Sequence, residues 1–176
     1  MTALRIVVMG VSGCGKSLIG GRLADELEVP FFDADDFHSP ANVAKMASGT
    51  PLTDADRSGW LSDLAGLIRT QDSGLVLACS ALKRDYRDRL RSGNAGVRFV
   101  YLRGEIGTIW SRHASRTDHY FNGRAMLESQ FQTLEEPGPE SEPDVLVVDV
   151  REPPERIVDL CLQSLGGDTG VGGADQ

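Results

Sequence analysis

The segment Gly10-Val-Ser-Gly-Cys-Gly-Lys-Ser17 decides the fold of this chain. It fits the pattern G-x-x-x-x-G-K-[ST], whose glycines let backbone N–H groups converge on phosphate oxygens. We expect Lys16 to reach the β- and γ-phosphates of ATP and the hydroxyl of Ser17 to bind Mg²⁺. Further nucleotide contacts are expected at Gly10, Ser12, Gly13, Cys14, Gly15 and Leu18. The segment therefore predicts a phosphate-binding loop with ATP and Mg²⁺ as cofactors.

The residues on both sides of this loop have the periodicity of a strand and of a helix. Residues 5–9 are rich in β-branched side chains, which predicts a buried parallel strand. Residues 16–27 carry leucine and isoleucine at helical spacing, and the positive end of such a helix would face the phosphates. Cys14, inside the loop, is either a small residue that fills space or a thiol whose pKa the helix N-terminus lowers.

Strand and helix patterns alternate along the rest of the chain. Further strands are predicted at 29–32, 74–79, 97–102 and 145–150. Helices are predicted at 55–69, 84–90, 106–115, 124–133 and 154–165. This alternation predicts an α/β fold in three layers, a parallel sheet between helices with its ligands at one edge. We expect one domain over residues 1–165 and a disordered, glycine-rich tail at 166–176.

Composition and charge narrow the class of protein. The formal net charge of −8 disfavours nucleic-acid binding and anchoring on an anionic membrane. The first apolar run, residues 4–11, is too short for a signal peptide, and no run approaches the length of a membrane span. The 3 cysteines are scattered without the spacing of a zinc site or a disulfide framework. We therefore expect a cytoplasmic protein that binds small molecules.

Carboxylates follow the second predicted strand. An acidic cluster at Asp33–Asp36 could hold Mg²⁺ through water or accept the proton of an attacking hydroxyl; it could also be a turn that begins a helix. The chain has no Asn-Lys-x-Asp element for guanine, and the strand at 74–79 ends in Cys-Ser without the usual aspartate. These features favour a small-molecule kinase over a GTPase.

Several blocks of residues, in order along the chain, resemble the gluconokinase family. They include Phe32-Asp-Ala-Asp35, Lys45-Met-Ala-Ser-Gly49, Pro51-Leu-x-Asp54-x-Asp56-Arg57, Trp60-Leu61, Ala78-Cys-Ser-Ala-Leu-Lys83, Tyr86-Arg87-Asp88, Gln130-Phe-x-Thr-Leu-Glu135 and Asp144-Val-Leu-Val-Val-Asp149. The resemblance covers residues 5 to about 165. It implies ATP-dependent phosphorylation of D-gluconate at its C6 hydroxyl, a nucleoside-monophosphate-kinase-like fold with strand order 2-3-1-4-5, and a homodimer.

The residues suggest how an anionic sugar acid could be bound. Lys83 and Arg87 lie four residues apart on a predicted helix face, and with Arg57 they could bind a carboxylate; a solvated helix is the alternative. We choose Asp35 as the residue that orients and deprotonates the acceptor hydroxyl, with Asp33 as the alternative base or a metal partner. Further substrate contacts are expected from Ser80 and His119. His38 could also bind a sugar hydroxyl, and the alternative is that it caps the next turn.

A lid is implied by the resemblance at about 112–123. Its arginines, Arg112 and Arg116, would neutralise charge on the transferring phosphoryl group, and Arg112 would also contact the nucleotide. A solvated basic helix end is the alternative. Thr117-Asp118 stands where the family usually has Lys-Gly. The resemblance also implies that the loop 149–154 contacts adenine.

Three other functions compete with this interpretation. A shikimate kinase also has Asp-x-Asp after the second strand, but it normally carries Gly-Gly-Gly where this chain has Ser80-Ala-Leu-Lys83. A nucleoside-monophosphate kinase would need arginines for a nucleotide acceptor, and that pattern is not evident. A non-catalytic ATP switch would have no use for Asp33, Asp35, Arg112 and Arg116 together.

Overall fold

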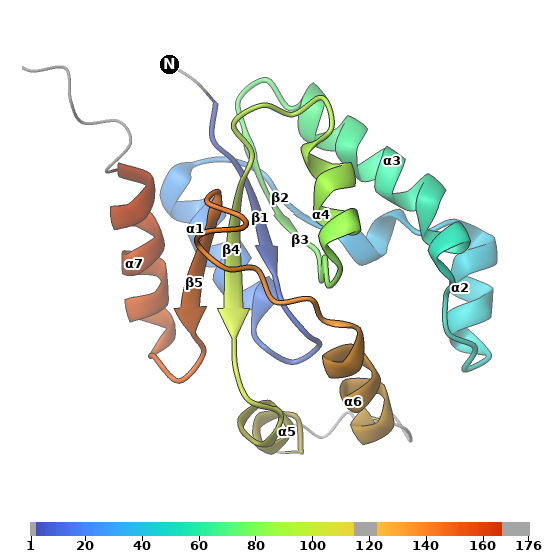
Figure 1. The fold of residues 1–176 in the computed structure, drawn as a ribbon. Coiled ribbons are helices and arrows are strands. Elements are labelled where there is room, and N and C mark those ends of the chain that lie inside the picture. The colour runs from blue at the N-terminus through green and yellow to red at the C-terminus, as the bar shows by residue number, and fades with distance from the viewer. Residues whose placement is uncertain (1–2, 115–122, 167–176) are drawn as a thin grey trace, which may run out of the picture.

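A computed structural model describes residues 3–114 and 123–166 of the chain (Figure 1). Five parallel strands form one sheet in the order β2-β3-β1-β4-β5. The strands are β1 (Arg5–Met9), β2 (Phe31–Asp33), β3 (Leu75–Ala78), β4 (Arg98–Arg103) and β5 (Val145–Asp149). The predicted fold class and strand order are confirmed. Residues 167–176 of the predicted tail lie outside the described residues.

Helices cover both faces of the sheet (Figure 1). On one face lie α1 (Lys16–Leu27) and α7 (Pro154–Gly166), and on the other lie α3 (Asp54–Thr70) and α4 (Arg84–Arg91). The other helices are α2 (Pro40–Ala47), α5 (Ile106–Ala114), α6 (Gly123–Thr133) and the 3₁₀ helix η1 (Ala34–Phe37). In Figure 1, α5 and α6 lie beyond the carboxyl ends of the strands, where a parallel sheet places its ligands.

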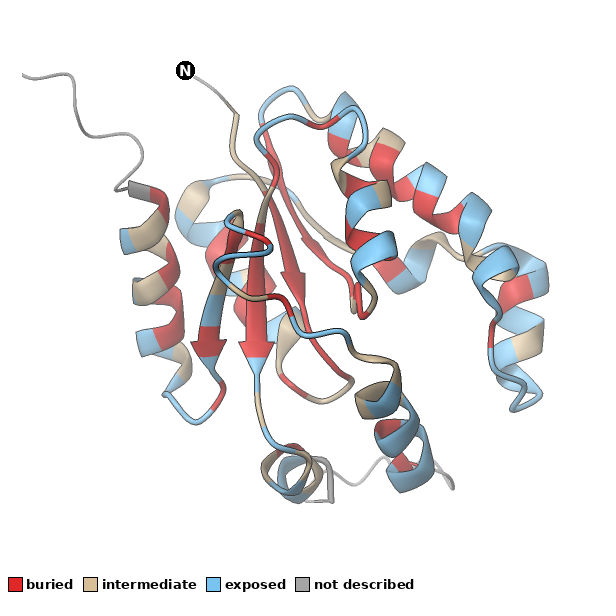
Figure 2. Ribbon diagram, in the orientation of Figure 1, coloured by how far each residue is buried: buried red, intermediate tan, exposed pale blue. Residues whose placement is uncertain are grey.

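Two hydrophobic cores sandwich the sheet. Along β1, Ile6 and Val8 pack into the core beneath α1 and α7, while Val7 and Met9 pack beneath α3 and α4. This alternation follows from the two-residue period of a strand, and it explains why the whole strand is apolar. Figure 2 shows the central strands buried between helices with exposed outer faces. None of the helices in the two described stretches combines the length and apolar character needed to span a bilayer.

Most predicted elements agree with the structure to within two residues, but η1 and α2 were missed. The signals for α2 were present: Pro40 stands at its first turn, and the Ser39 side chain accepts a hydrogen bond from the Asn42 N–H at 3.1 Å. The element η1 was missed because a helix of four residues is too short to show an apolar period.

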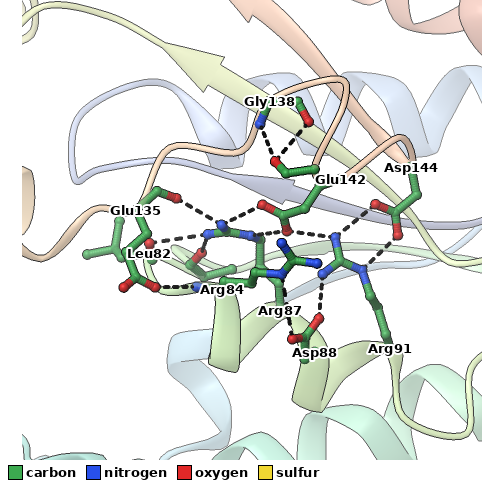
Figure 3. A network of polar contacts seen from close by, with 11 residues as sticks. Leu82, Arg84, Arg87, Asp88, Arg91, Glu135, Gly138, Glu142 and Asp144 are labelled. Atoms are coloured by element: carbon green, nitrogen blue, oxygen red, sulfur yellow. Dashed lines mark hydrogen bonds and ion pairs between the residues drawn. The ribbon is translucent and has the colours of Figure 1, made fainter.

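A buried ion pair joins α4 to the loop that precedes β5 (Figure 3). The Arg87 side chain is 1% exposed, and its Nε and Nη2 donate to the Glu142 carboxylate at 2.7 and 2.8 Å. Its other donors reach the carbonyl oxygens of Ala81, Leu82 and Glu135 at 2.8, 3.2 and 2.8 Å. All five N–H groups of the guanidinium are therefore used within the protein.

Arg91 extends this pair into a network. It donates to both carboxylate oxygens of Asp144, at 2.7 and 2.8 Å, and to Glu142 at 2.9 Å (Figure 3). Burial alone would raise the pKa of Glu142, but the hydrogen bonds from Arg87 and Arg91 lower it below its usual range. The network fixes residues 135–144 against α4 and against the turn that follows β3.

We expect Glu142→Ala to lower the free energy of unfolding by about 3–5 kcal/mol, because it leaves the buried Arg87 charge without a partner. Urea denaturation at neutral pH measures the change. Glu140→Ala is the matched control, since Glu140 is exposed in the same loop, and should have little effect.

The difference in unfolding free energy between the wild-type protein and Glu142→Ala should depend on pH. The lowered pKa means that Glu142 contributes fully above the ordinary carboxyl range and loses its contribution as the pH falls through the lowered pKa. The stability gap between the wild-type protein and Glu142→Ala should therefore narrow in acid. A gap of less than 1 kcal/mol at neutral pH would contradict the assignment of a strong buried pair.

Candidate active site

The phosphate loop connects β1 to α1, and its backbone requires glycine. Gly10 has a φ of 146°, and a Cβ there would lie 2.7 Å from the Cys14 Sγ and 3.0 Å from the Leu102 carbonyl oxygen. Gly15, with a φ of 103°, precedes the first residue of α1. Cys14 is buried, and burial raises the pKa of its thiol. The interpretation of Cys14 as an activated thiol is therefore wrong, and its role as a space-filling residue holds.

Some polar groups of the phosphate loop are hydrogen-bonded within the protein, and other backbone N–H groups of the loop are not. The Lys16 Nζ donates to the carbonyl oxygens of Gly10 and Val11 at 3.0 and 3.1 Å. The Ser12 N–H donates to the Gln130 Oε1 at 2.6 Å. Within the described part of the chain, the N–H groups of Gly13 and Gly15 make no hydrogen bond to another residue. These groups remain available to an anion at the helix N-terminus.

The sheet brings the first acidic residue to this loop. Asp33 ends β2 and pairs with Ala78 of β3, which in turn pairs with Val8 of β1. The Ser17 hydroxyl donates to the Asp33 Oδ2 at 3.3 Å. A hydroxyl and a carboxylate at this spacing suit Mg²⁺, which binds through one or two protein oxygens and keeps its other positions for water and phosphate. The two predicted metal ligands therefore lie together and fit the ion.

Asp35 lies on η1, beside Asp33. The Asp33 Oδ1 accepts a hydrogen bond from the Asp35 N–H at 3.0 Å, and the Trp60 Nε1 anchors η1 by donating to the Ala34 carbonyl oxygen at 2.7 Å. The Asp35 residue is exposed at the surface, yet partial desolvation, and then the charge of Asp33, raise the pKa of its carboxyl. The charge of Lys16 acts on it in the opposite direction.

His38 follows η1 and stacks on Trp60. The ring centroids are 4.3 Å apart and the planes differ by 15°. The His38 Nδ1 lies 3.4 Å from the Asn42 Nδ2. Desolvation lowers the pKa of the imidazole; the nearby Arg57 lowers it further, while Asp35 opposes the shift. The lowered pKa favours the neutral imidazole, which can exchange hydrogen bonds with a hydroxyl.

Two predicted cations converge on Tyr86 of α4. The Arg57 guanidinium lies 5.5 Å from the Tyr86 ring centroid, and its Nη1 donates to the Tyr86 hydroxyl at 3.2 Å. The Lys83 Nζ also lies 5.5 Å from the ring centroid and is 3.2 Å from both carboxylate oxygens of Asp54. The Tyr86 hydroxyl donates to Asp54. Arg57, Lys83 and Tyr86 thus form a surface that already holds one carboxylate.

Arg87 is the predicted substrate contact that the structure contradicts. Its guanidinium is buried and has no donor left, so it cannot receive a substrate carboxylate. The four-residue spacing from Lys83 was misleading because Lys83 precedes α4 as its N-cap, so the pair does not share a helix face. Ser80 lies in the turn after β3, where its carbonyl oxygen accepts from the Gly10 N–H at 3.3 Å.

The predicted lid, at about 112–123, falls mostly outside the described residues. Arg112 is exposed on α5, while Arg116, His119 and Thr117-Asp118 lie outside the described residues. A pocket of about 820 Å³ opens beside α5, at the carboxyl ends of β4 and β5. Its lining includes Phe131 of α6, and Asp149 and Arg151 from the predicted adenine loop.

Sequence reasoning gave no role to three residues that the structure places at the site. Tyr86 and Asp54 complete the cation cluster, and Gln130 contacts the phosphate loop. All three residues lie within the blocks that resemble the family, and that was the available signal. Their partners could not be read from the sequence, because Gln130 and Ser12 are 118 positions apart.

The parallel sheet, the phosphate loop and the acidic pair beside Lys16 define a P-loop kinase. A family described as Shikimate kinase matches residues 12–166. The thermoresistant gluconokinase of Escherichia coli (strain K12) is 46% identical over 160 residues, 89% of this chain and 90% of its own length. The gluconokinase of Gluconobacter oxydans (strain 621H) is 42% identical, over 91% of this chain and 88% of its length.

Solved structures agree with these relatives. A gluconokinase from Sinorhizobium meliloti 1021 superposes with a TM-score of 0.84 at 40% identity, covering 93% of this chain and 92% of that one. The shikimate kinase from Aquifex aeolicus shares only the fold, with a TM-score of 0.57 at 19% identity, over 97% of this chain and 100% of that one. The chain belongs to the gluconokinase family, within the wider shikimate kinase family of P-loop proteins.

We expect the His38 imidazole to titrate below its ordinary pKa of about 6.5, because desolvation disfavours its charged form. Asp35→Asn should lower the midpoint further, since it removes a charge that favours the imidazolium. NMR titration measures both values, with His38→Gln to assign the resonance. A midpoint above the ordinary value, or no change in Asp35→Asn, would contradict this geometry.

Proposed function

We propose that this protein transfers the γ-phosphoryl group of ATP to the C6 hydroxyl of D-gluconate, giving 6-phospho-D-gluconate and ADP. One observation carries the proposal: a continuous line of charged and polar groups runs from the phosphate loop to a carboxylate-binding cluster. Hydrogen bonds join Ser17 to Asp33 and Asp33 to the Asp35 N–H. The Asn42 side chain then lies between His38 and the Asp56 carbonyl oxygen, beside Arg57. Arg57 then meets Lys83 at Tyr86.

D-Gluconate has a shape that matches this line. Its carboxylate and its C6 hydroxyl stand at opposite ends of a six-carbon chain. Bound with the carboxylate at Arg57 and Lys83, the molecule would direct its other end past His38 toward Asp35 and the phosphates. The names and high identity of the relatives support the same substrate.

The mechanism follows from the residues along the line. The raised pKa of Asp35 makes its carboxylate a better proton acceptor than an ordinary aspartate, so it can orient and deprotonate the attacking hydroxyl. Lys16 would leave the carbonyl oxygens of its own loop to reach the phosphates. Ser17 and Asp33 would hold Mg²⁺, which when bound neutralises charge on the phosphates. Arg112 and Arg116 would act from the lid, and His119 would contact the substrate.

An acceptor panel tests the proposal. We expect rapid ADP release with MgATP and D-gluconate, and little with shikimate, with nucleoside monophosphates or without acceptor. Mass spectrometry of the product identifies the phosphate position, and sedimentation measures the proposed homodimer. Turnover with shikimate in place of gluconate would refute the substrate, and ATP binding without turnover would favour a switch.

Asp35→Asn tests the proposed base. We expect kcat to fall by about 10²–10⁴-fold, the usual contribution of general acid–base catalysis, with little change in ATP affinity. In the wild-type protein, kcat should rise with pH through an acid limb above the ordinary aspartate pKa of 3.8, because the carboxyl must be deprotonated. Asp36→Asn is the matched control on the same helix. Near-normal turnover of Asp35→Asn would remove Asp35 from the mechanism.

A further inference from the structure

One contact of the phosphate loop has no part in the proposed reaction. The Ser12 N–H donates to the Gln130 Oε1 at 2.6 Å, a bond that joins the loop to α6 across 118 positions of sequence. Among the described residues of α6, Gln130 is the one whose side chain forms a hydrogen bond with the phosphate loop. A neutral amide oxygen accepts this bond without adding negative charge beside the phosphates.

The position of Gln130 is fixed by the packing of its own helix. Leu127 is fully buried in the core beneath α1, and Phe131 and Leu134 pack against the same core. On its outer side, the Arg124 guanidinium lies 5.4 Å from the Trp110 ring centroid of α5. The side chain of Gln130 therefore reaches the loop from a helix that is packed on the core.

The carboxyl end of α6 is tied to a second functional segment. The Glu135 N–H donates to the Leu82 carbonyl oxygen at 2.8 Å, and the Glu135 Oε1 accepts from the Arg84 N–H at 2.8 Å. Arg87 donates to the Glu135 carbonyl oxygen at 2.8 Å (Figure 3). Residues 130–135 therefore touch the phosphate loop at one end and the turn 80–83, which carries Lys83, at the other.

We propose that Gln130 is a positioning residue for the nucleotide: its amide oxygen holds the Ser12 N–H and thereby fixes the shape of the phosphate loop. The bond anchors the middle of the loop to a packed helix, so that the Gly13 and Gly15 N–H groups stay directed toward the bound phosphates. Through residues 130–135, the same helix holds the loop at a set distance from the turn 80–83. The inference deepens the proposed function, since it assumes only that the loop binds ATP.

Direct nucleotide binding tests the role of Gln130. Gln130→Met keeps the length of the side chain and its helix propensity but removes the acceptor. We expect it to weaken MgADP and MgATP binding about fivefold to tenfold by calorimetry and to raise the KM for ATP similarly, with the KM for the acceptor changed by less than about twofold. Gln132→Met is the matched control, because Gln132 is exposed on the same helix.

A second variant separates positioning from stability. Gln130→Glu keeps an acceptor oxygen for the Ser12 N–H but adds a negative charge beside the phosphate loop. We expect the added charge to weaken MgATP binding more than Gln130→Met does, because like charges repel. Melting temperatures should remain within a few degrees of the wild-type value for both variants. Unchanged ATP affinity in Gln130→Met, or a loss that follows the melting temperature alone, would overturn the proposal.

The two proposals fail in different ways. Calorimetry with MgADP needs no acceptor, so it reports on Gln130 even if D-gluconate is not the substrate. A wild-type protein that binds nucleotide but does not phosphorylate gluconate would refute the proposed function alone. Equal nucleotide binding by the wild-type protein and both Gln130 variants would refute the role of Gln130 alone.

Discussion

The close approach of backbone and side chain at Gly10 is the constraint on which the rest of the site depends. A Cβ at this position would collide with Cys14 and press on the Leu102 carbonyl oxygen. Only glycine lets the chain leave β1, turn and enter α1 in so small a space. The same turn packs Cys14 into the core, so the thiol is a structural residue although it lies in the phosphate loop.

The parallel sheet converts this local turn into a site. Because all strands run the same way, the ends of β1, β2 and β3 meet at one edge, and Asp33 arrives beside Ser17. The environment then separates the acidic residues into different roles. Desolvation and a neighbouring charge raise the pKa of Asp35, whereas hydrogen bonds from Tyr86 and Lys83 lower that of the exposed Asp54. One group is suited to accept a proton, and the other remains a fixed anion.

Away from the sheet edge that carries the candidate site, a buried ion pair stabilises the fold. Arg87 and Glu142 are among the few charged residues in the described core, and each satisfies the other. Their bonds secure the turn after β3, where Ala81 has a φ of 45°, to the loop before β5. The phosphate loop is bonded in turn to Gln130 of α6. Segments with little regular structure are thus fixed by long-range polar bonds to packed helices.

The sequence by itself determined the phosphate loop, the alternation of strands and helices, and the family blocks. These are local signals: glycine spacing, the periods of apolar side chains, and runs of residues in order. Its strand order followed from the resemblance and is confirmed by the sheet. The element η1 was missed because four residues are too few to show a helical period, whereas α2 was missed although Ser39 and Pro40 mark its start.

Only the tertiary structure decided which polar residues face the site and which support it. Arg57, Lys83 and Arg87 look alike as cations in the sequence. In the structure, Arg57 and Lys83 meet at Tyr86, whereas Arg87 donates all its hydrogen bonds to Glu142 and to backbone carbonyl oxygens. Burial and hydrogen-bond partners come from segments more than 50 positions away, such as Glu142 for Arg87. Such pairings depend on how helices and loops pack together, and no local pattern of residues encodes them.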